Sequence, residues 1–553
     1  MRPGRGEAAF KLAAVGLLSL LVAFTAVPLL VLVARAASAA GELGLWSLWS
    51  SPATLQALRG TLVTSTGAAA MSFVLGLPLA VLLERTDLPH RHALRAAFTL
   101  PTAIPPFIWG MGWVALANPR AGLLNRALGA GTVDIYSGFG VAFVLGAAGL
   151  PLVMLPAAAV LARLDPSHAE AARDFGAGPV RTHLAVPVRL ALPAAASGAA
   201  LVFLFAAAAF GVPYLLGVTA TPPTPTLTTR IYAEMLMGPA GLWNAAAYSL
   251  LLLAMAVVVL LLSRLLGRSG RTALLSGKGL KQRALQLGPL RTPLSAAVIA
   301  LALVLVVAPL LAVALASLTT PAGDLTVSHW GRVLADPRTL SATVNSVALS
   351  LAAAAAVTTL GLVLSMIRRR SAALGHAAEL LAAWPYAVPG TVLAIALLAA
   401  FSRDLRFVFF DSFALVLALA NTLWLLLLAW VAKHLAFGTR NAAEGLARVD
   451  PSLAEAARVS GAGPLRAFVD AVVPQLKGPL AAAFTLTFLT CATELTLAVL
   501  LVPPGRDVLG TLLFELQSYA DPASAAVIAC AFVLFVLAVL GTRAALVARR
   551  VDA

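Results

Sequence analysis

Long apolar stretches without charged residues dominate the chain and indicate its fold. Ten intervals between consecutive charged residues each hold more than twenty mainly apolar residues, and two further apolar runs cover 194–218 and 480–502. A helix that crosses the hydrocarbon core of a bilayer needs about 20 such residues. The pattern therefore predicts an all-α polytopic membrane protein with about twelve spans, at 11–35, 59–84, 95–120, 134–163, 194–218, 234–264, 291–324, 338–368, 379–403, 411–433, 480–502 and 521–543.

The first span resembles a signal peptide, because Arg2, Arg5 and Lys11 precede it. Its apolar run, 12–34, is longer than the usual apolar region of a signal peptide, which has about 7 to 15 residues. We therefore predict a retained membrane helix, with cleavage as the alternative.

Composition and charge agree with a membrane protein. The chain of 553 residues is 60% hydrophobic and 11% charged, which excludes a soluble enzyme. Of the 39 Lys and Arg residues, 29 fall in segments on the same side as the N-terminus, so the net charge of +16 is a topology signal. It places both termini in the cytoplasm and leaves no basic excess that would indicate nucleic-acid binding. Cys491 and Cys530 lie in apolar runs and are interpreted as small buried side chains.

A sequence repeat divides the chain into two halves. At an offset of 285 residues, 161–181 and 446–466 are identical at 16 of 21 positions. Six spans per half is an even number, so both halves have the same orientation and the repeated segment is cytoplasmic in each. The predicted organisation is a first half at 1–270, a basic cytoplasmic linker at 271–292 and a second half at 293–553.

The repeated segment has the local chemistry of a short capped helix. In each copy an Asp-Pro pair supplies a cap acceptor followed by a proline suited to the first helical position, at Asp165 and Asp450. The helix-forming sequence Ala-Glu-Ala-Ala-Arg follows, and a glycine suited to the C-terminal cap comes next, at Gly176 and Gly461. Such a helix on the membrane face can fit into a groove of a partner protein; the alternative is a loop that only connects two spans.

This segment resembles the EAA loop of the permeases of binding-protein-dependent ABC importers. The matching residues are Glu170, Ala171, Ala172 and Gly176 in the first half and Glu455, Ala456, Ala457 and Gly461 in the second. The resemblance implies the type I (MetI-like) importer permease fold and makes these residues the ATPase-coupling loops. It also implies, as partners, two copies of an ATP-binding subunit, a periplasmic or lipid-anchored substrate-binding protein and the lipid bilayer. The expected location is the bacterial inner membrane.

Other segments are similar to one branch of this family, the fused two-half permeases of ferric-iron uptake. These segments are 100–105, 210–217, 227–232, 386–390 and Glu494-Leu495. Ferric iron is therefore the expected substrate, while thiamine, phosphonate and polyamine stay open as alternatives. The sequence shows no cluster of Tyr, His or carboxylate residues suited to a hard ferric ion.

The sequence offers no catalytic, cofactor or metal motif. It lacks a GxxxxGK[ST] loop, so we expect ATP hydrolysis by a partner rather than by this chain. The rival classes are a secondary transporter and a polytopic membrane enzyme. A secondary transporter usually needs several ionisable groups within its spans, and the repeated loop favours the importer permease over both rivals.

Glu494 is the one charged residue placed within a predicted span. Because a buried carboxylate is costly in a membrane, we expect it to face protein or the translocation pathway. The predicted role is to brace an outward gate; the alternatives are a purely structural carboxylate near the outer end of the span or a pair with Arg506.

Overall fold

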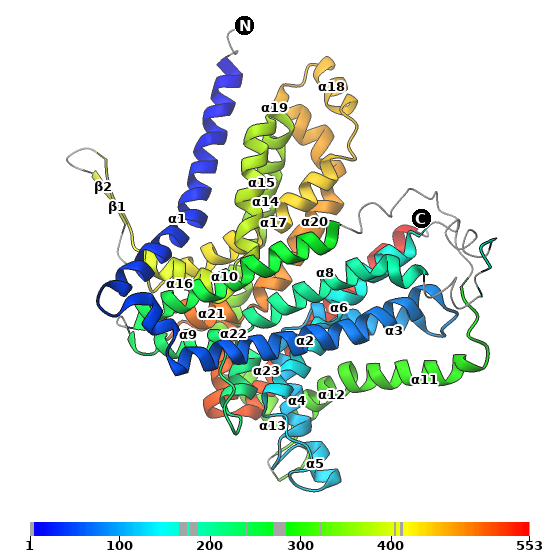
Figure 1. Ribbon diagram of the computed structural model, residues 1–553. Coiled ribbons are helices and arrows are strands. Elements are labelled where there is room, and N and C mark those ends of the chain that lie inside the picture. Colours follow the sequence, from blue (N-terminus) through cyan, green and yellow to red (C-terminus); the bar gives the residue numbers. More distant parts are fainter. Residues whose placement is uncertain are drawn as a thin grey trace. The chain divides into compact units, whose positions relative to one another are not determined.

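The computed structural model describes residues 5–164, 174–176, 178, 186–238, 241–268, 284–320, 322–402, 405–409 and 413–551. Within these ranges, nine helical segments are long and apolar enough to cross a membrane. Two bent helix pairs raise that number to eleven if each pair is one span. The all-helical polytopic fold predicted from the sequence is confirmed (Figure 1).

The chain folds into two compact units, each made of separate stretches of sequence. Unit 1 comprises Met1–Leu45, Glu234–Leu250 and Asp336–Leu512, and unit 2 comprises Trp46–Ala233, Leu251–Ala335 and Leu513–Ala553. Each unit therefore combines segments from both halves of the sequence. The boundaries 1–270, 271–292 and 293–553 stay a prediction about the repeat, since the compact units divide the chain differently.

The described elements follow this division. Unit 2 contains α2 Pro52–Arg85, α3 Arg91–Thr99, η1 Leu100–Thr102, α4 Pro106–Ala117, α5 Leu123–Leu128, α6 Gly138–Ala162, α8 Val186–Ala208, η3 Pro213–Val218, η6 Gly288–Leu290, α11 Arg291–Ala302, η7 Leu303–Val307, α12 Ala308–Ser317, α13 Ser328–Ala335, η10 Leu516–Ala520 and α23 Pro522–Val551. Unit 1 contains most of α1 Arg5–Trp49, and α14 Pro337–Arg370, α15 Ala372–Ala387, α16 Gly390–Phe401, β1 Leu405–Phe409, β2 Phe413–Leu417, α17 Leu423–Leu446, α18 Ser452–Val459, α19 Pro464–Ala467, η8 Phe468–Val472, η9 Val473–Leu476, α20 Lys477–Ala492 and α21 Thr496–Leu501. Three further helices cross the division: α9 Leu227–Met235, α10 Gly241–Arg268 and α22 Leu509–Glu515.

The long helices α2 and α14 begin at side-chain caps. The Ser51 hydroxyl accepts a hydrogen bond from the Thr54 amide at 3.3 Å. The Asp336 carboxylate accepts the Thr339 amide at 3.1 Å. In both helices a proline occupies the first turn, where its missing N–H costs nothing.

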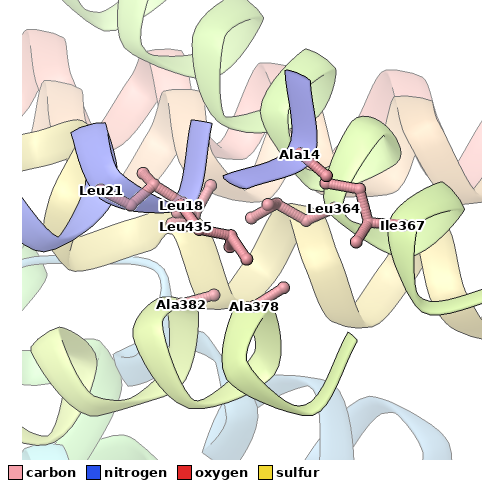
Figure 2. Packing of buried hydrophobic residues seen from close by; sticks show 8 residues of the cluster. All are labelled: Ala14, Leu18, Leu21, Leu364, Ile367, Ala378, Ala382 and Leu435. Atoms are coloured by element: carbon pink, nitrogen blue, oxygen red, sulfur yellow. The ribbon is translucent and has the colours of Figure 1, made fainter. Parts of the chain in front are cut away.

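Helix α1 packs against helices of the second sequence half. Figure 2 shows three of its side chains facing α14, α15 and α17. The buried cluster consists of Ala14, Leu18, Leu21, Leu364, Ile367, Ala378, Ala382 and Leu435. In unit 2, α12 of the second half lies against α4, where a Cβ added at Gly112 would meet the Pro309 carbonyl oxygen at 2.5 Å. The first apolar helix of each half thus packs with elements of the other half.

Two predicted spans are sharply bent at a proline. The pair made of Arg91–Thr102 and Pro106–Ala117 bends by 105°, and the pair of Ala372–Ala387 and Gly390–Phe401 bends by 110°. The bends fall at Pro105 and Pro389, which are the N-caps of α4 and α16. A proline disfavours helical geometry in the residue before it, so the preceding helix ends there.

The span predicted at 411–433 is wrong in its position. Strand β2 lies in its first part, paired antiparallel with β1 so that Leu405 opposes Leu417, and α17 begins only at Leu423. The helix then continues beyond Lys433 to Leu446. The predicted span ends at Lys433 because a charge was expected outside the membrane. In the structure the Lys433 ammonium donates to the Val388 carbonyl oxygen at 3.0 Å, so the lysine can lie within the helix.

Candidate functional site

The coupling helix predicted in the second half is α18, Ser452–Val459. The Asp450 carboxylate accepts a hydrogen bond from the Ser452 amide at 2.9 Å and so caps its start. Hydrogen bonds from the Ser452 backbone and side chain hold the pKa of Asp450 below its usual value. The cap that the Asp-Pro pair predicts is therefore formed.

The end of α18 is a Schellman motif built on Gly461. The Gly461 amide donates to the Arg458 carbonyl, and the Ala462 amide donates to the Ala457 carbonyl, each at 3.0 Å. Gly461 has a φ of +89°, a left-handed conformation that costs about 1–2 kcal/mol for residues with a Cβ. Glycine is thus required here by the backbone of the turn.

Helix α18 is exposed yet anchored. None of its residues is buried, and the apolar side chains of Leu453 and Val459 are 41% and 89% exposed. Leu465, in the following helix α19, is 74% exposed. Ala454 packs on a buried cluster formed by Leu446, Val449, Val472 and Leu476. A helix held in place from beneath while presenting apolar and charged groups, including Glu455, has the character of a docking surface.

The first copy of this loop is only partly described. Glu170, Ala171 and Ala172 lie outside the described residues. Gly176 is described and has a φ of +78°, close to the +89° of Gly461 at the equivalent position. The two glycines that the repeat pairs therefore share one backbone conformation.

Glu494 lies in the break between α20 and α21. Its carboxylate accepts hydrogen bonds from the Leu497 amide at 2.9 and 3.0 Å and from the Ala498 amide at 3.3 Å. The Trp430 indole also donates to it at 3.4 Å. The carboxylate thus satisfies the first amides of α21, where the helix dipole favours a negative charge. Arg506 is not among these described partners.

A second charged residue, Lys433, belongs to the same cluster. It interacts electrostatically with Glu494 while its ammonium group is bonded to Val388, in the bend between α15 and α16. A Cβ added at Gly390, which begins α16, would contact the Thr496 side chain at 3.5 Å. The bend of one helix pair and the break of another are therefore adjacent in unit 1, and α17 links them.

The sequence reasoning missed Lys433 and Trp430 as partners of Glu494. The repeat contained a signal for Lys433. The position equivalent to Lys433 at the offset of 285 residues is Ala148, so this charge occurs in one half and is replaced by alanine in the other.

Among the described residues, no group of three or more His, Cys, Asp or Glu side chains is placed to hold a metal ion. The candidate functional features are therefore the exposed helix α18 and the charged cluster around Glu494.

Comparison with known proteins extends these observations. Residues 72–272 and 357–552 each match the family described as "Binding-protein-dependent transport system inner membrane component". The two matches begin 285 residues apart, which is the offset of the sequence repeat. The duplication is therefore one of a whole family domain.

Similar transport permeases match either most of the chain or about a third of it. The chain is 26% identical over 501 residues to the Fe(3+)-transport system permease protein FbpB 2 of Haemophilus influenzae, with 88% of each chain covered. It is 28% identical over 226 residues to the molybdenum transport system permease protein ModB of Escherichia coli (strain K12), covering 39% of this chain and 94% of that protein. It is also 30% identical over 181 residues to ModB of Azotobacter vinelandii, covering 32% and 79%.

Two family domains lie in one chain, and nine to eleven helices in the described part can span a membrane. The similarity to the permease FbpB 2 covers 88% of each chain. The chain belongs to the family of inner membrane components of binding-protein-dependent transport systems, as a fused permease with two copies of the family domain.

Proposed function

We propose that this chain is the permease subunit of an ABC importer for ferric iron, which a separate substrate-binding protein delivers. The observation that supports ferric iron as the substrate is how much of the chain matches an iron permease. The iron permease FbpB 2 matches across both halves, with 88% of each chain covered. The molybdenum permease of Escherichia coli matches over 39% of this chain, which is less than the two domains together.

Molybdate is the second candidate, because its permeases match at comparable identity, 28% for that of Escherichia coli. The two candidates differ in charge: ferric iron is a hard cation and molybdate is an oxyanion. A cation favours oxygen ligands, whereas an oxyanion favours N–H and O–H donors.

In this proposal, energy comes from two copies of an ATP-binding subunit, one at each repeated loop. The exposure of α18 and its anchoring from beneath support docking at the second loop. Gly176 has the same left-handed conformation as Gly461, which supports a similar turn at the end of the first loop. With these loops in the cytoplasm, both termini also lie in the cytoplasm, as the distribution of basic residues indicates.

Uptake in cells tests the substrate. Cells that lack this chain should lose uptake of radiolabelled ferric iron and keep uptake of radiolabelled molybdate, and the wild-type chain should restore the loss. A chain with Gly461→Pro serves as the coupling-defective control. Loss of molybdate uptake with intact iron uptake would overturn the iron assignment in favour of molybdate.

A further inference from the structure

Three of the six tyrosines of the chain gather in unit 2. Tyr214 lies in η3, Tyr232 in α9 and Tyr519 in η10. The hydroxyl groups of Tyr214 and Tyr519 are hydrogen-bonded to each other, and the side chain of Tyr519 also interacts with that of Tyr232. The rings of Tyr214 and Tyr232 lie 5.5 Å apart, edge to face. Segments far apart in the sequence thus bring three phenol oxygens together.

The cluster has a buried aromatic base and an open polar side. Phe210 and Phe514, with ring centres 5.5 Å apart, are 1% and 4% exposed. The ring of Phe514 lies 5.0 Å from that of Tyr214. Tyr519, by contrast, is 64% exposed, and its bond to Tyr214 lies in the exposed part. The rings are therefore fixed from beneath, while the hydroxyl groups meet where a solute can reach them.

Both sequence repeats contribute to this cluster. Tyr232 lies in the first half of the sequence and Tyr519 in the second. Both tyrosines precede the last apolar helix of their half, α10 and α23. With cytoplasmic termini, these segments lie on the outer side of the membrane, where a binding protein delivers its cargo.

The arrangement of the oxygens favours a cation over an oxyanion. The hydroxyl oxygens of Tyr214 and Tyr519 already face each other, so a metal ion that replaces their protons can bind both oxygens. In an octahedral site with metal–oxygen bonds of about 2.0 Å, neighbouring ligand oxygens are about 2.8 Å apart, a typical O–H···O spacing. An oxyanion would instead need each hydroxyl to donate outward, which breaks the bond between Tyr214 and Tyr519.

The nearby carboxylate of Asp521 is already engaged. It accepts hydrogen bonds from the Ser524 hydroxyl at 2.5 Å and from the amides of Ala523 and Ser524 at 3.1 and 3.2 Å. It therefore caps α23, and the phenol oxygens supply the ligands of the candidate site.

We propose that Tyr214, Tyr232 and Tyr519 form a receiving site for a ferric ion on the outer side of the permease. The ion binds through the phenol oxygens, whose protons pass to water, and water or the anion that accompanies the cargo fills the remaining positions. This inference rests on the proposed ferric-iron function and gives that function a specific entry site.

The test uses the purified full-length chain in lipid nanodiscs, titrated with ferric nitrilotriacetate. Tyrosinate bound to ferric iron absorbs visible light by charge transfer from ligand to metal. We expect this band in the wild type, with apparent affinity lowered about tenfold or more in Tyr214→Phe, Tyr232→Phe and Tyr519→Phe. The triple variant should lose the band, while Tyr136→Phe, a phenol of the same unit outside the cluster, should leave it unchanged.

Three results would overturn the proposal: no band in the wild type, an equal band in the triple variant, or hydroxyl-dependent binding of molybdate without binding of iron. Phenylalanine keeps every ring, and thermal unfolding of each variant checks that the fold persists. Ferric-iron uptake in cells separates the two hypotheses. If uptake requires the chain yet the triple variant binds and transports iron normally, the receiving site is wrong while the ferric function stands.

Discussion

Replacing Glu494 tests whether it and Lys433 stabilise one another. In Glu494→Leu, the Leu497 amide loses its acceptor, a cap worth about 1 kcal/mol. Lys433 also loses its countercharge, and removing one partner of a buried pair costs about 3–5 kcal/mol. Because Lys433 is only half-buried and keeps its bond to Val388, we expect the lower end of that range for the pair, and with the cap about 4 kcal/mol in total.

Glu494→Gln separates the cap from the charge. Its amide oxygen can still accept from Leu497, so the loss is mainly the attraction to Lys433. In a medium of effective dielectric about 20, two unit charges about 4 Å apart attract by about 4 kcal/mol, an upper bound for this half-buried pair. The Gln variant should therefore be destabilised less than the Leu variant, and its transport should be closer to normal if Glu494 braces a gate.

A double-mutant cycle isolates the pair. Glu494→Gln, Lys433→Met and their combination are compared by free energy of unfolding in mixed micelles, with Glu455→Gln on exposed α18 as a control expected within about 0.5 kcal/mol of wild type. We expect the double variant to recover about 1–3 kcal/mol relative to the sum of the single changes. Additive losses, with a coupling below about 0.5 kcal/mol, would refute the idea that the two charges stabilise each other.

The remaining predictions concern the coupling helix and the packing of unit 1. Gly461→Pro together with Gly176→Pro should abolish co-purification of an ATP-binding subunit while leaving the permease inserted, because proline cannot adopt the left-handed conformation; retention of the ATPase would contradict this. Glu170→Ala and Glu455→Ala should differ in their effect on transport-coupled ATP hydrolysis, since the two loops diverge in sequence after Arg181 and Arg466. Since the pKa of Asp450 is lowered in the fold, its cap stabilises α18 above the unfolded pKa and is lost as pH falls through the folded value, below about 4. Hydrogen-exchange protection of α18 should therefore fall at acid pH in the wild type, and Asp450→Asn should remove that dependence. Gly438→Ala should lower the unfolding temperature, because a Cβ there would lie 2.1 Å from the Val357 carbonyl oxygen; an unchanged temperature would show that α14 and α17 can separate without cost.

Local features of the fold were predictable because their chemistry is local. The Asp-Pro cap and the glycine that ends α18 depend on residues within a few positions of each other, and both are formed as the sequence indicates. Most of the spans likewise follow from apolar length, and the span predicted at 411–433 is the exception. The packing of α1 against α14, α15 and α17 was not predictable, because a helix that is apolar all round shows no single face that must be buried.

The charged cluster and the tyrosine cluster depend on contacts between distant segments, which leave no local pattern in the sequence. A charge beside an apolar run predicts the end of a span, but the contact of Lys433 with Val388 accommodates this lysine within α17. Tyr214 and Tyr519 lie 305 residues apart, so no short stretch of sequence indicates their contact. The repeat adds long-range information for the charged cluster. Positions where one half has a charge and the other has alanine, as at Lys433 and Ala148, mark where the two halves differ. At such a position a substitution perturbs one half of the permease alone, because its counterpart in the other half lacks the charge.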